Sequence, residues 1–453
     1  AEWSRKLAER VGRELALPVY LYEYAQPNAA RKNLSIIRAG EYEGFFKKIK
    51  LPEWQPDFGP AEFDAKRGAT VIGARDFLIA YNVNLNTTST RRANAVAFDV
   101  REVGRPKKDA QGNVVKDAAG KPVNIPGTLK SVKAIGWFIE EYGVAQISMN
   151  LTNIAVTPLH VAFDEVCRAA GERGLRVTGS ELVGLVPLNS LLEAGRYFLR
   201  KQKRSVGVSE KELIKIAVRS LGLSELAPFK PEERVIEYLL RDAGKAKLVG
   251  MDLRTFADET ASESVAPGGG SISAYVGALG AALGTMVANL SSHKVGWDER
   301  WEEFSAWAVQ GQRIKDELLA LVDEDTAAFN GIMAAFALPK GTDLEKAART
   351  AAIQAATRQA IEVPFRVMQL SADALPIAVA MAEKGNPNSV SDAGVGALCA
   401  RAAVQGAYLN VRINVKGFAD KVFAEKVVRE GAAIEARALE LEKQALAAVH
   451  AAM

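Results

Sequence analysis

The sequence has 453 residues, of which 48% are hydrophobic and 25% are charged, with a formal net charge of +4. This length is enough for two or three hydrophobic cores, and so small a charge excess argues against a nucleic-acid-binding protein. The two cysteines, Cys167 and Cys399, lie far apart, which indicates a reducing compartment and no disulfide framework. The three histidines are scattered without ligand spacing, so we expect no metal site.

The pattern in residues 1–76 predicts a helix, a strand, a second helix and a loop-rich tail. Residues 1–16 are amphipathic and carry charges throughout, so they are not a signal peptide. This segment starts without a methionine in the middle of a pattern, and we therefore expect the chain to be N-terminally shortened. Residues 18–22 are aromatic and β-branched, which predicts a strand.

Residues 77–180 give predicted strands and helices in the order βαββαβ. The polar excursion at 104–127 holds two similar turns, DAQGN and DAAGK, and predicts an extended loop or hairpin tip. The order is that of the split-βαβ, ferredoxin-like plan. The predicted elements are strands at 77–85, 132–139, 145–150 and 175–179, and helices at 88–101 and 158–170.

Strand signals end after Met251, and the rest of the chain is predicted to be helical. We therefore expect a multi-domain protein, an α/β part followed by an all-α domain. The predicted boundaries are a remnant of a first subdomain at 1–76, a second α/β subdomain at 77–240, a linker at 241–249 and an all-helical domain at 250–453.

Residues 266–292 contain no charged residue, and Gly280 and Gly284 form a GxxxG pattern. Such a pattern marks some transmembrane dimers. However, the segment is mostly Ala, Gly and Ser and includes Asn289, so its hydrophobicity is low for membrane insertion. We expect a buried, tightly packed helix and no membrane span.

Three glycines, Gly268 to Gly270, precede this helix and are followed by Ser271. Glycines before a helix leave backbone N–H groups free at the positive end of its dipole, which suits an anionic or polar ligand. Ser271 is expected to cap the helix. A tight structural loop is the alternative interpretation.

Asp323, Glu324 and Asp325 place three carboxylates on one predicted helical turn. Like charges that are buried together raise one another's pKa, which suits proton transfer. A solvated acidic face is the alternative, but Val322, Ala328 and Phe329 indicate that part of this turn is buried. We expect one of the three carboxylates to point inward.

Two later segments of the helical part also contain polar residues that are candidates for a site. Lys340 lies near a predicted turn, where a surface charge is the alternative. Asp392 or Ser391 is expected to cap a long helix that contains Asn410 and Asn414 one turn apart. Asparagine is unfavourable inside helices, so this pair predicts a ligand contact or, equally simply, a contact between helices.

These strings together resemble the formiminotransferase-cyclodeaminase family over essentially the whole chain. The front half carries IRAGEYE, PDFGP, GATVIGARDFLIAYNVNL and GSELVGLVPL, which are similar to the transferase domain. The back half carries APGGGS, LVDEDTAAF, LPKGT and NSVSDAGVGALCARAAVQGAYLNVRINV, which are similar to the cyclodeaminase domain.

The resemblance implies a two-step reaction of histidine degradation and folate one-carbon metabolism. A formimino group passes from N-formimino-L-glutamate to tetrahydrofolate, and cyclodeamination then gives 5,10-methenyltetrahydrofolate and ammonia. It also implies polyglutamylated tetrahydrofolate as substrate and carrier, no metal, a cytoplasmic location and a ring-like homo-oligomer.

The resemblance also implies site residues. Asp325 matches the family's cyclodeaminase carboxylate, and we expect it to move protons during ring closure. Candidates for the same pocket are Gly268, Gly269, Gly270, Ser271, Asp323, Lys340, Asp392, Asn410 and Asn414. The folate-binding loop of the transferase matches Gly59, Pro60, Ala61, Glu62, Phe63, Asp64, Ala65, Lys66, Arg67 and Gly68.

One departure concerns the transferase. The family's catalytic histidine lies in a segment upstream of residue 1, and none of the three histidines here matches it. If the polypeptide starts at Ala1, we expect an inactive transferase and an active cyclodeaminase. The alternatives are a methenyltetrahydrofolate cyclohydrolase and a non-catalytic folate-binding subunit.

Overall fold

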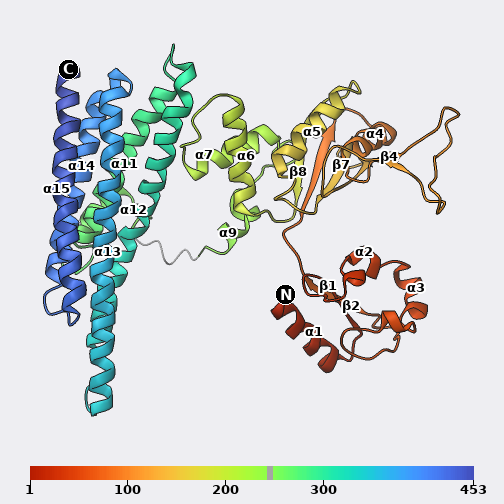
Figure 1. The fold of residues 1–453 in the computed structure, drawn as a ribbon, viewed down its shortest axis with the longest axis horizontal. Coiled ribbons are helices and arrows are strands. Elements are labelled where there is room, and N and C mark those ends of the chain that lie inside the picture. The colour runs from red at the N-terminus through yellow and green to blue at the C-terminus, as the bar shows by residue number, and fades with distance from the viewer. Residues whose placement is uncertain (242–247) are drawn as a thin grey trace. The chain divides into compact units, whose positions relative to one another are not determined.

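The computed structural model describes residues 1–241 and 248–453. Contacts group residues 1–80, 98–134 and 149–157 into one compact unit, and residues 81–97, 135–148 and 158–453 into a second. Most of the predicted linker, residues 242–247, lies outside the described part. Figure 1 shows the elements in chain order.

The N-terminal segment packs a helix against a pair of parallel strands. Strands β1 and β2 pair from Val19 with Thr70 to Glu23 with Ala74, and their core is Ala8, Val19, Leu21 and Ala25. The predicted strand at 18–22 is therefore present as β1. The elements are α1 (Glu2–Leu15), β1 (Val19–Glu23), η1 (Ala29–Arg31), α2 (Leu34–Ile37), α3 (Glu41–Lys48), η2 (Pro52–Trp54) and β2 (Thr70–Ala74).

A four-stranded sheet follows, with strands in the order β6-β7-β3-β8. This is the strand order of the split-βαβ plan, so the predicted α/β class is confirmed. The elements are β3 (Ile79–Leu85), α4 (Thr90–Val100), β4 (Arg105–Pro106), β5 (Asn124–Ile125), β6 (Val132–Ile139), β7 (Val144–Leu151), α5 (Leu159–Gly171) and β8 (Val177–Val183). Strand β8 runs four residues past the predicted end at 179.

Strand β3 shows why the alternating pattern was informative. Its apolar residues at alternate positions, such as Tyr81 and Val83, are fully buried. The intervening Asn84 is also buried, and it is hydrogen-bonded: its amide donates to Glu225 at 2.6 Å and accepts from Gln146 at 2.8 Å. Both faces of the strand are therefore covered, one by apolar side chains and one by a satisfied polar network.

The excursion at 104–127 is a hairpin whose short strands β4 and β5 pair antiparallel. Asp109 accepts the backbone N–H of Gln111 and Asn113, and Asp117 does the same for Ala119 and Lys121. Each aspartate thus closes its own turn, as the repeated turn motif predicts.

Short helices lead into the C-terminal bundle. They are α6 (Leu188–Lys201), α7 (Glu210–Leu221), α8 (Pro231–Arg234), α9 (Ile236–Leu239) and α10 (Leu253–Thr260). The bundle consists of α11 (Gly269–Ser292), η3 (Asp298–Arg300), α12 (Trp301–Phe336), α13 (Asp343–Lys384), η4 (Pro387–Ser389), α14 (Val390–Asn414) and α15 (Lys421–Ala452). Among residues 248–453 there is no strand, so the all-helical prediction is confirmed.

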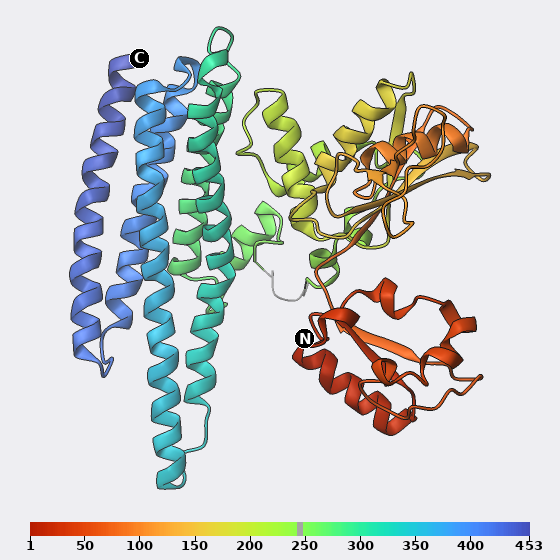
Figure 2. The ribbon, with the colours of Figure 1, turned by 45° about the vertical axis from the view of Figure 1, so that its right-hand side comes forward.

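The long helices lie side by side, as Figure 2 shows. Helix α11 packs against α12, α13 and α14, and α15 covers α13 and α14. A β-carbon on Gly280 would lie 2.8 Å from the carbonyl oxygen of Gly396, so α11 and α14 approach at backbone distance. The GxxxG pattern therefore serves close packing within the bundle.

Two helices, α11 and α13, are long and apolar enough to cross a membrane by length and composition. Their most apolar windows are 61% and 72% buried inside the bundle. Such burial is typical of core helices, because apolar side chains that face other helices need no lipid contact.

Candidate functional site

Asp325 on α12 lies against the first turn of α11. The hydroxyl of Ser271 is 3.1 Å from Oδ2 of Asp325, and it also reaches the carbonyl oxygen of Val322 at 2.9 Å and the hydroxyl of Thr326 at 3.2 Å. The backbone N–H of Ser271 also donates to the Asp325 carboxylate. The carboxylate therefore sits at the positive end of a helix dipole, where a negative charge is favoured.

The glycines before Ser271 permit this approach. Gly270 is buried with its α-carbon directly beside the Asp325 carboxylate, leaving no room for a side chain. A β-carbon on Gly269 would lie 3.2 Å from the amide nitrogen of Asn410 on α14, while one on Gly268 would meet open space. The glycine run therefore brings α11 close to side chains from two other helices.

Two opposing effects act on the pKa of Asp325. Burial raises its pKa above the ordinary carboxyl value, and the hydroxyl and backbone N–H of Ser271 act in the opposite direction. Burial is the larger effect. A carboxyl group with a raised pKa exchanges protons more readily near neutral pH than an ordinary aspartate does.

The other two carboxylates of this turn face elsewhere. Asp323 accepts the backbone N–H of Leu248 at 2.8 Å and that of Val249 at 3.5 Å, so it holds the chain entering the helical bundle. Glu324 is exposed. Of the three, Asp325 is the one that points to the start of α11.

Of the asparagine pair on α14, Asn414 makes a contact between helices, and a ligand contact by Asn410 stays a prediction. Asn410 lies beside Gly269, and its amide donates to the carbonyl of Gly406 in its own helix at 2.9 Å. Asn414 donates to the carbonyl of Ala360 on α13 at 2.7 Å, which is a contact between helices. Only Asn410 of the pair adjoins the Asp325 turn.

The predicted loop at 59–68 is anchored at its base by a buried ion pair. Arg31 lies 2.6 Å from Oδ1 of Asp57, while Oδ2 of Asp57 accepts the N–H of Leu21 and the amide of Gln26. Within the loop, the N–H of Gly68 donates to the carbonyl of Asp64 at 2.7 Å. The ring of Phe63 packs on those of Tyr42, Phe45 and Phe46. A cavity of about 210 Å³ adjoins the loop's end at Ala69.

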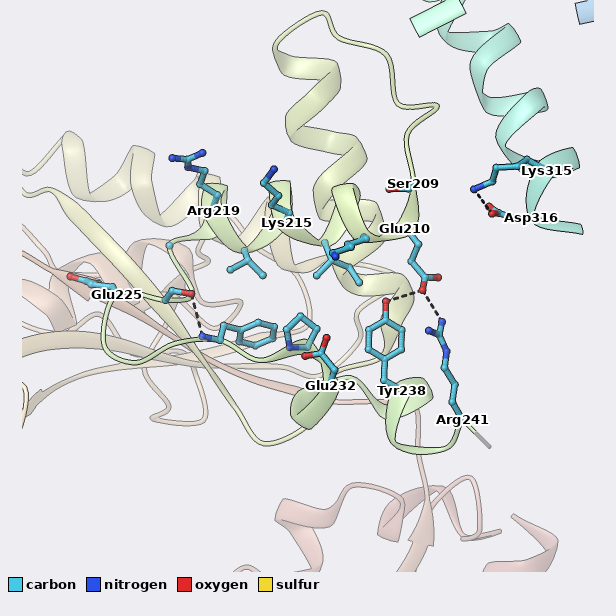
Figure 3. A pocket seen from close by; sticks show the side chains of 17 residues that line it. Ser209, Glu210, Lys215, Arg219, Glu225, Glu232, Tyr238, Arg241, Lys315 and Asp316 are labelled. Carbon is cyan, nitrogen blue, oxygen red and sulfur yellow. Dashed lines mark hydrogen bonds and ion pairs between the residues drawn. The ribbon is translucent and has the colours of Figure 1, made fainter. Parts of the chain in front are cut away.

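Figure 3 shows a different cavity, of about 1120 Å³, beside α7 and α9. Ile214, Val218 and Phe229 contribute to its apolar lining. Glu210 on its rim is already engaged by the hydroxyl of Tyr238 at 2.8 Å and the guanidinium of Arg241 at 2.7 Å. None of the predicted site residues lines this cavity.

Sequence models of known families match three consecutive stretches of the chain. The model described as formiminotransferase-cyclodeaminase matches residues 252–433, the formiminotransferase domain matches 80–241, and its N-terminal subdomain matches 1–75. The formimidoyltransferase-cyclodeaminase of Rattus norvegicus is 42% identical over 421 residues, which are 93% of this chain and 74% of that protein.

The chain belongs to the formiminotransferase-cyclodeaminase family. It carries both enzymatic domains of these bifunctional, folate-processing enzymes. The methenyltetrahydrofolate cyclohydrolase of Methylorubrum extorquens is 41% identical over 171 residues, 38% of this chain and 82% of that protein. A formiminotetrahydrofolate cyclodeaminase structure from Thermotoga maritima gives a TM-score of 0.41 at 28% identity, covering 45% of this chain and 98% of that one.

The structure does not bring every predicted residue of the cyclodeaminase domain to Asp325. Asp392 is in the first turn of α14 and Asn410 near its end, roughly 27 Å apart at 1.5 Å per residue. Lys340 is exposed in the turn after α12. Within one chain, Asp392, Lys340 and Asn414 therefore lie apart from the turn where Asp325, Gly270 and Ser271 meet.

Two predicted helix caps are wrong. The N-cap of α11 is Gly268, and Ser271 lies inside the helix, where its hydroxyl is drawn to the Val322 carbonyl and Asp325. The N-cap of α14 is Ser389, because the short η4 turn runs directly into the helix and starts it before Ser391 and Asp392.

Sequence analysis missed one residue near Asp325 and misjudged the exposure of another. The hydroxyl of Thr326 lies within hydrogen-bond distance of the Ser271 hydroxyl. The only sequence feature that could have pointed to Thr326 is its position directly after the acidic run. Phe329, expected to be buried, is 36% exposed. Within residues 1–241 and 248–453, no group of three or more His, Cys, Asp or Glu side chains is placed to hold a metal ion.

Proposed function

We propose that the helical domain converts 5-formiminotetrahydrofolate to 5,10-methenyltetrahydrofolate, with Asp325 as its proton carrier. The observation that carries this proposal is the half-buried Asp325 carboxylate, which accepts hydrogen bonds from the hydroxyl and the backbone N–H of Ser271 in the first turn of α11. Burial raises the pKa of Asp325, so the group is suited both to take up and to release a proton.

A single carboxylate is sufficient for the proton transfers of the proposed reaction. The formimino group reacts as its protonated amidinium form. The N10 lone pair forms a bond to the formimino carbon, the C=N π electrons move onto the formimino nitrogen as an NH2 group, and the N10 proton passes to Asp325. The former formimino nitrogen then takes that proton, its bond to carbon breaks, and ammonia leaves. The carbon remains joined to N5 and N10 as the methenyl cation, and the Asp325 carboxylate is regenerated in position to stabilise it.

Replacing Asp325 with Asn tests this role. The amide keeps the shape and one acceptor oxygen for Ser271 but cannot carry the proton. We expect ammonia release from 5-formiminotetrahydrofolate to fall about 100-fold or more. Glu324→Gln makes the same chemical change on the exposed neighbouring residue and should keep the parent rate. Equal rates for the two variants would refute the role of Asp325.

We propose that the front half transfers the formimino group from N-formimino-L-glutamate to tetrahydrofolate, with the loop at 59–68 holding the folate. The match to both formiminotransferase subdomains supports this activity. Support for the loop comes from its anchored base at Asp57 and the rings around Phe63, which offer an aromatic surface. Formimino transfer measured by loss of N-formimino-L-glutamate tests it.

A cyclohydrolase is the second candidate, because the Methylorubrum extorquens relative, which matches 38% of this chain, carries that name. The two reactions differ in their products. A cyclohydrolase opens the methenyl ring with water and releases no ammonia. The matches to both transferase subdomains favour the cyclodeaminase. Ammonia release from 5-formiminotetrahydrofolate would decide between them.

We also propose that the chain forms a homo-oligomer through α11 and α14. Support comes from an apolar stripe on the outer side of α11 at alternating spacings of four and three residues, as in helices that pack on a partner. It consists of Ile272, Val276, Leu279, Leu283, Met286 and Leu290, all half-buried or exposed. Exposed Val395, Leu398 and Leu409 continue it on α14.

The remaining expectations stay proposals. Domain boundaries near 76, 240 and 250 are supported by the three matched ranges. Polyglutamylated tetrahydrofolate as substrate, catalysis without a metal, a role in histidine degradation and a cytoplasmic location follow from the family resemblance alone.

A further inference from the structure

Helix α12 continues well past the point where it meets α11. Ser271 in the first turn of α11 contacts α12 at Val322 and Asp325, and α12 runs on to Phe336, roughly 16 Å beyond Asp325. Figures 1 and 2 show α12 and α13 projecting past the other helices of the bundle. The α12 face that carries Asp325 therefore continues without α11 to cover it.

Phe329 is the first large apolar side chain on this uncovered face. It lies one turn beyond Asp325, so the two side chains share a face about 6 Å apart along the helix axis. Among the exposed large apolar residues that the structure describes from residue 248 onward, two are aromatic, Phe329 and Phe336. The guanidinium of Arg349 lies 5.6 Å from the Phe336 ring centre. No ring or cation contact within the described residues involves Phe329.

The chemistry of the substrate places rings beside the reacting atoms. The carbon that is closed into the methenyl ring joins N5 of the pterin to N10 of the p-aminobenzoyl group. A carboxylate that serves this carbon therefore has a flat ring system on either side within a few ångströms. An exposed phenyl ring one helical turn away is in reach of one of them.

We propose that Phe329 is the platform on which one ring system of the folate stacks while Asp325 moves the protons. The proposal rests on the cyclodeaminase function above and assigns a substrate contact within that site. Phe329 would thus determine affinity and orientation, and it would take no part in proton transfer.

Kinetics of three variants test the platform in the full chain. Phe329→Leu keeps an apolar side chain but removes the ring, Phe329→Tyr keeps the ring, and Phe336→Leu is the matched control farther along α12. KM and kcat for 5-formiminotetrahydrofolate are measured by ammonia release. The inhibition constant of 5-formyltetrahydrofolate, whose oxygen replaces the leaving nitrogen, is measured in the same assay, so the transferase site does not contribute.

Phe329→Leu should raise KM and the inhibition constant about three- to tenfold while kcat stays within about twofold. Phe329→Tyr and Phe336→Leu should resemble the parent. Equal KM for the two leucine variants, a loss confined to kcat, or a changed oligomeric state in Phe329→Leu would overturn the platform. Absence of ammonia release from the parent chain would instead refute the proposed function, so the two failures are distinguishable.

Discussion

A β-carbon on Gly270 would lie 2.5 Å from Cγ of Asp325, well inside van der Waals distance. These residues are far apart in sequence, on α11 and α12, yet the Asp325 carboxylate fills the space that a side chain at position 270 would need. The glycine at this position of the α11 first turn is thus explained by the Asp325 carboxylate, since any larger residue would displace it.

Gly270→Ala should therefore disable the cyclodeaminase without unfolding the bundle. The added methyl group pushes the Asp325 carboxylate from its place, and a displacement of about 1 Å can cost about 100-fold in rate. Gly269→Ala is the control, because its methyl group meets the end of the flexible Asn410 side chain at 3.2 Å. Turnover of 5-formiminotetrahydrofolate is measured for both. Equal rates would show that the carboxylate position is not critical.

The pH dependence of stability should change in Asp325→Asn. Burial raises the pKa of Asp325 in the folded protein, so between the unfolded and folded pKa values the native state binds more protons than the unfolded state. The free energy of unfolding therefore falls as pH rises through this window. Asn buries no charge, so the variant should be more stable than the parent at neutral pH.

This advantage should shrink as pH falls toward the ordinary aspartate pKa of 3.8. Denaturant unfolding followed by circular dichroism at several pH values measures it, with Glu324→Gln as the control. A parent chain more stable than Asp325→Asn at neutral pH would mean that the hydrogen bonds from Ser271 outweigh burial.

The ion pair of Arg31 and Asp57 should stabilise the N-terminal segment. Both side chains are 12% exposed, so Asp57→Ala leaves a guanidinium buried without its partner. Removing one member of such a pair costs about 3–5 kcal/mol. Glu14→Gln breaks the exposed pair with Arg10 and should cost less than about 1 kcal/mol. Thermal unfolding of the two variants makes the comparison, and similar small losses would contradict the prediction.

A charge on the outer stripe of α11 should weaken self-association. Leu279 is 44% exposed there, and Leu279→Glu would place a carboxylate in the proposed interface. Light scattering after size exclusion should show a smaller species than the parent. Leu439→Glu, on an equally exposed leucine of α15, should leave the mass unchanged. A variant at Leu279 with the parent's mass would place the interface elsewhere.

The sequence by itself determined most of the element types and their order, although strand β2 (Thr70–Ala74) forms where a loop-rich tail was expected. The alternation in β3 and the end of strand signals after Met251 are local properties of neighbouring residues, so the ferredoxin-like plan and the helical bundle follow from them. The turns at Asp109 and Asp117 were equally local, because each aspartate binds backbone N–H groups within its own turn.

Tertiary structure alone decided which of the three neighbouring carboxylates turns toward α11. Asp323, Glu324 and Asp325 have nearly the same local pattern, but their surroundings differ. Asp323 accepts the N–H of Leu248, Glu324 is exposed to solvent, and Asp325 contacts Ser271. The same holds for Asn410 and Asn414, and for Phe329, whose exposure depends on where α11 begins. Contacts between distant segments set these outcomes, and no local periodicity encodes them.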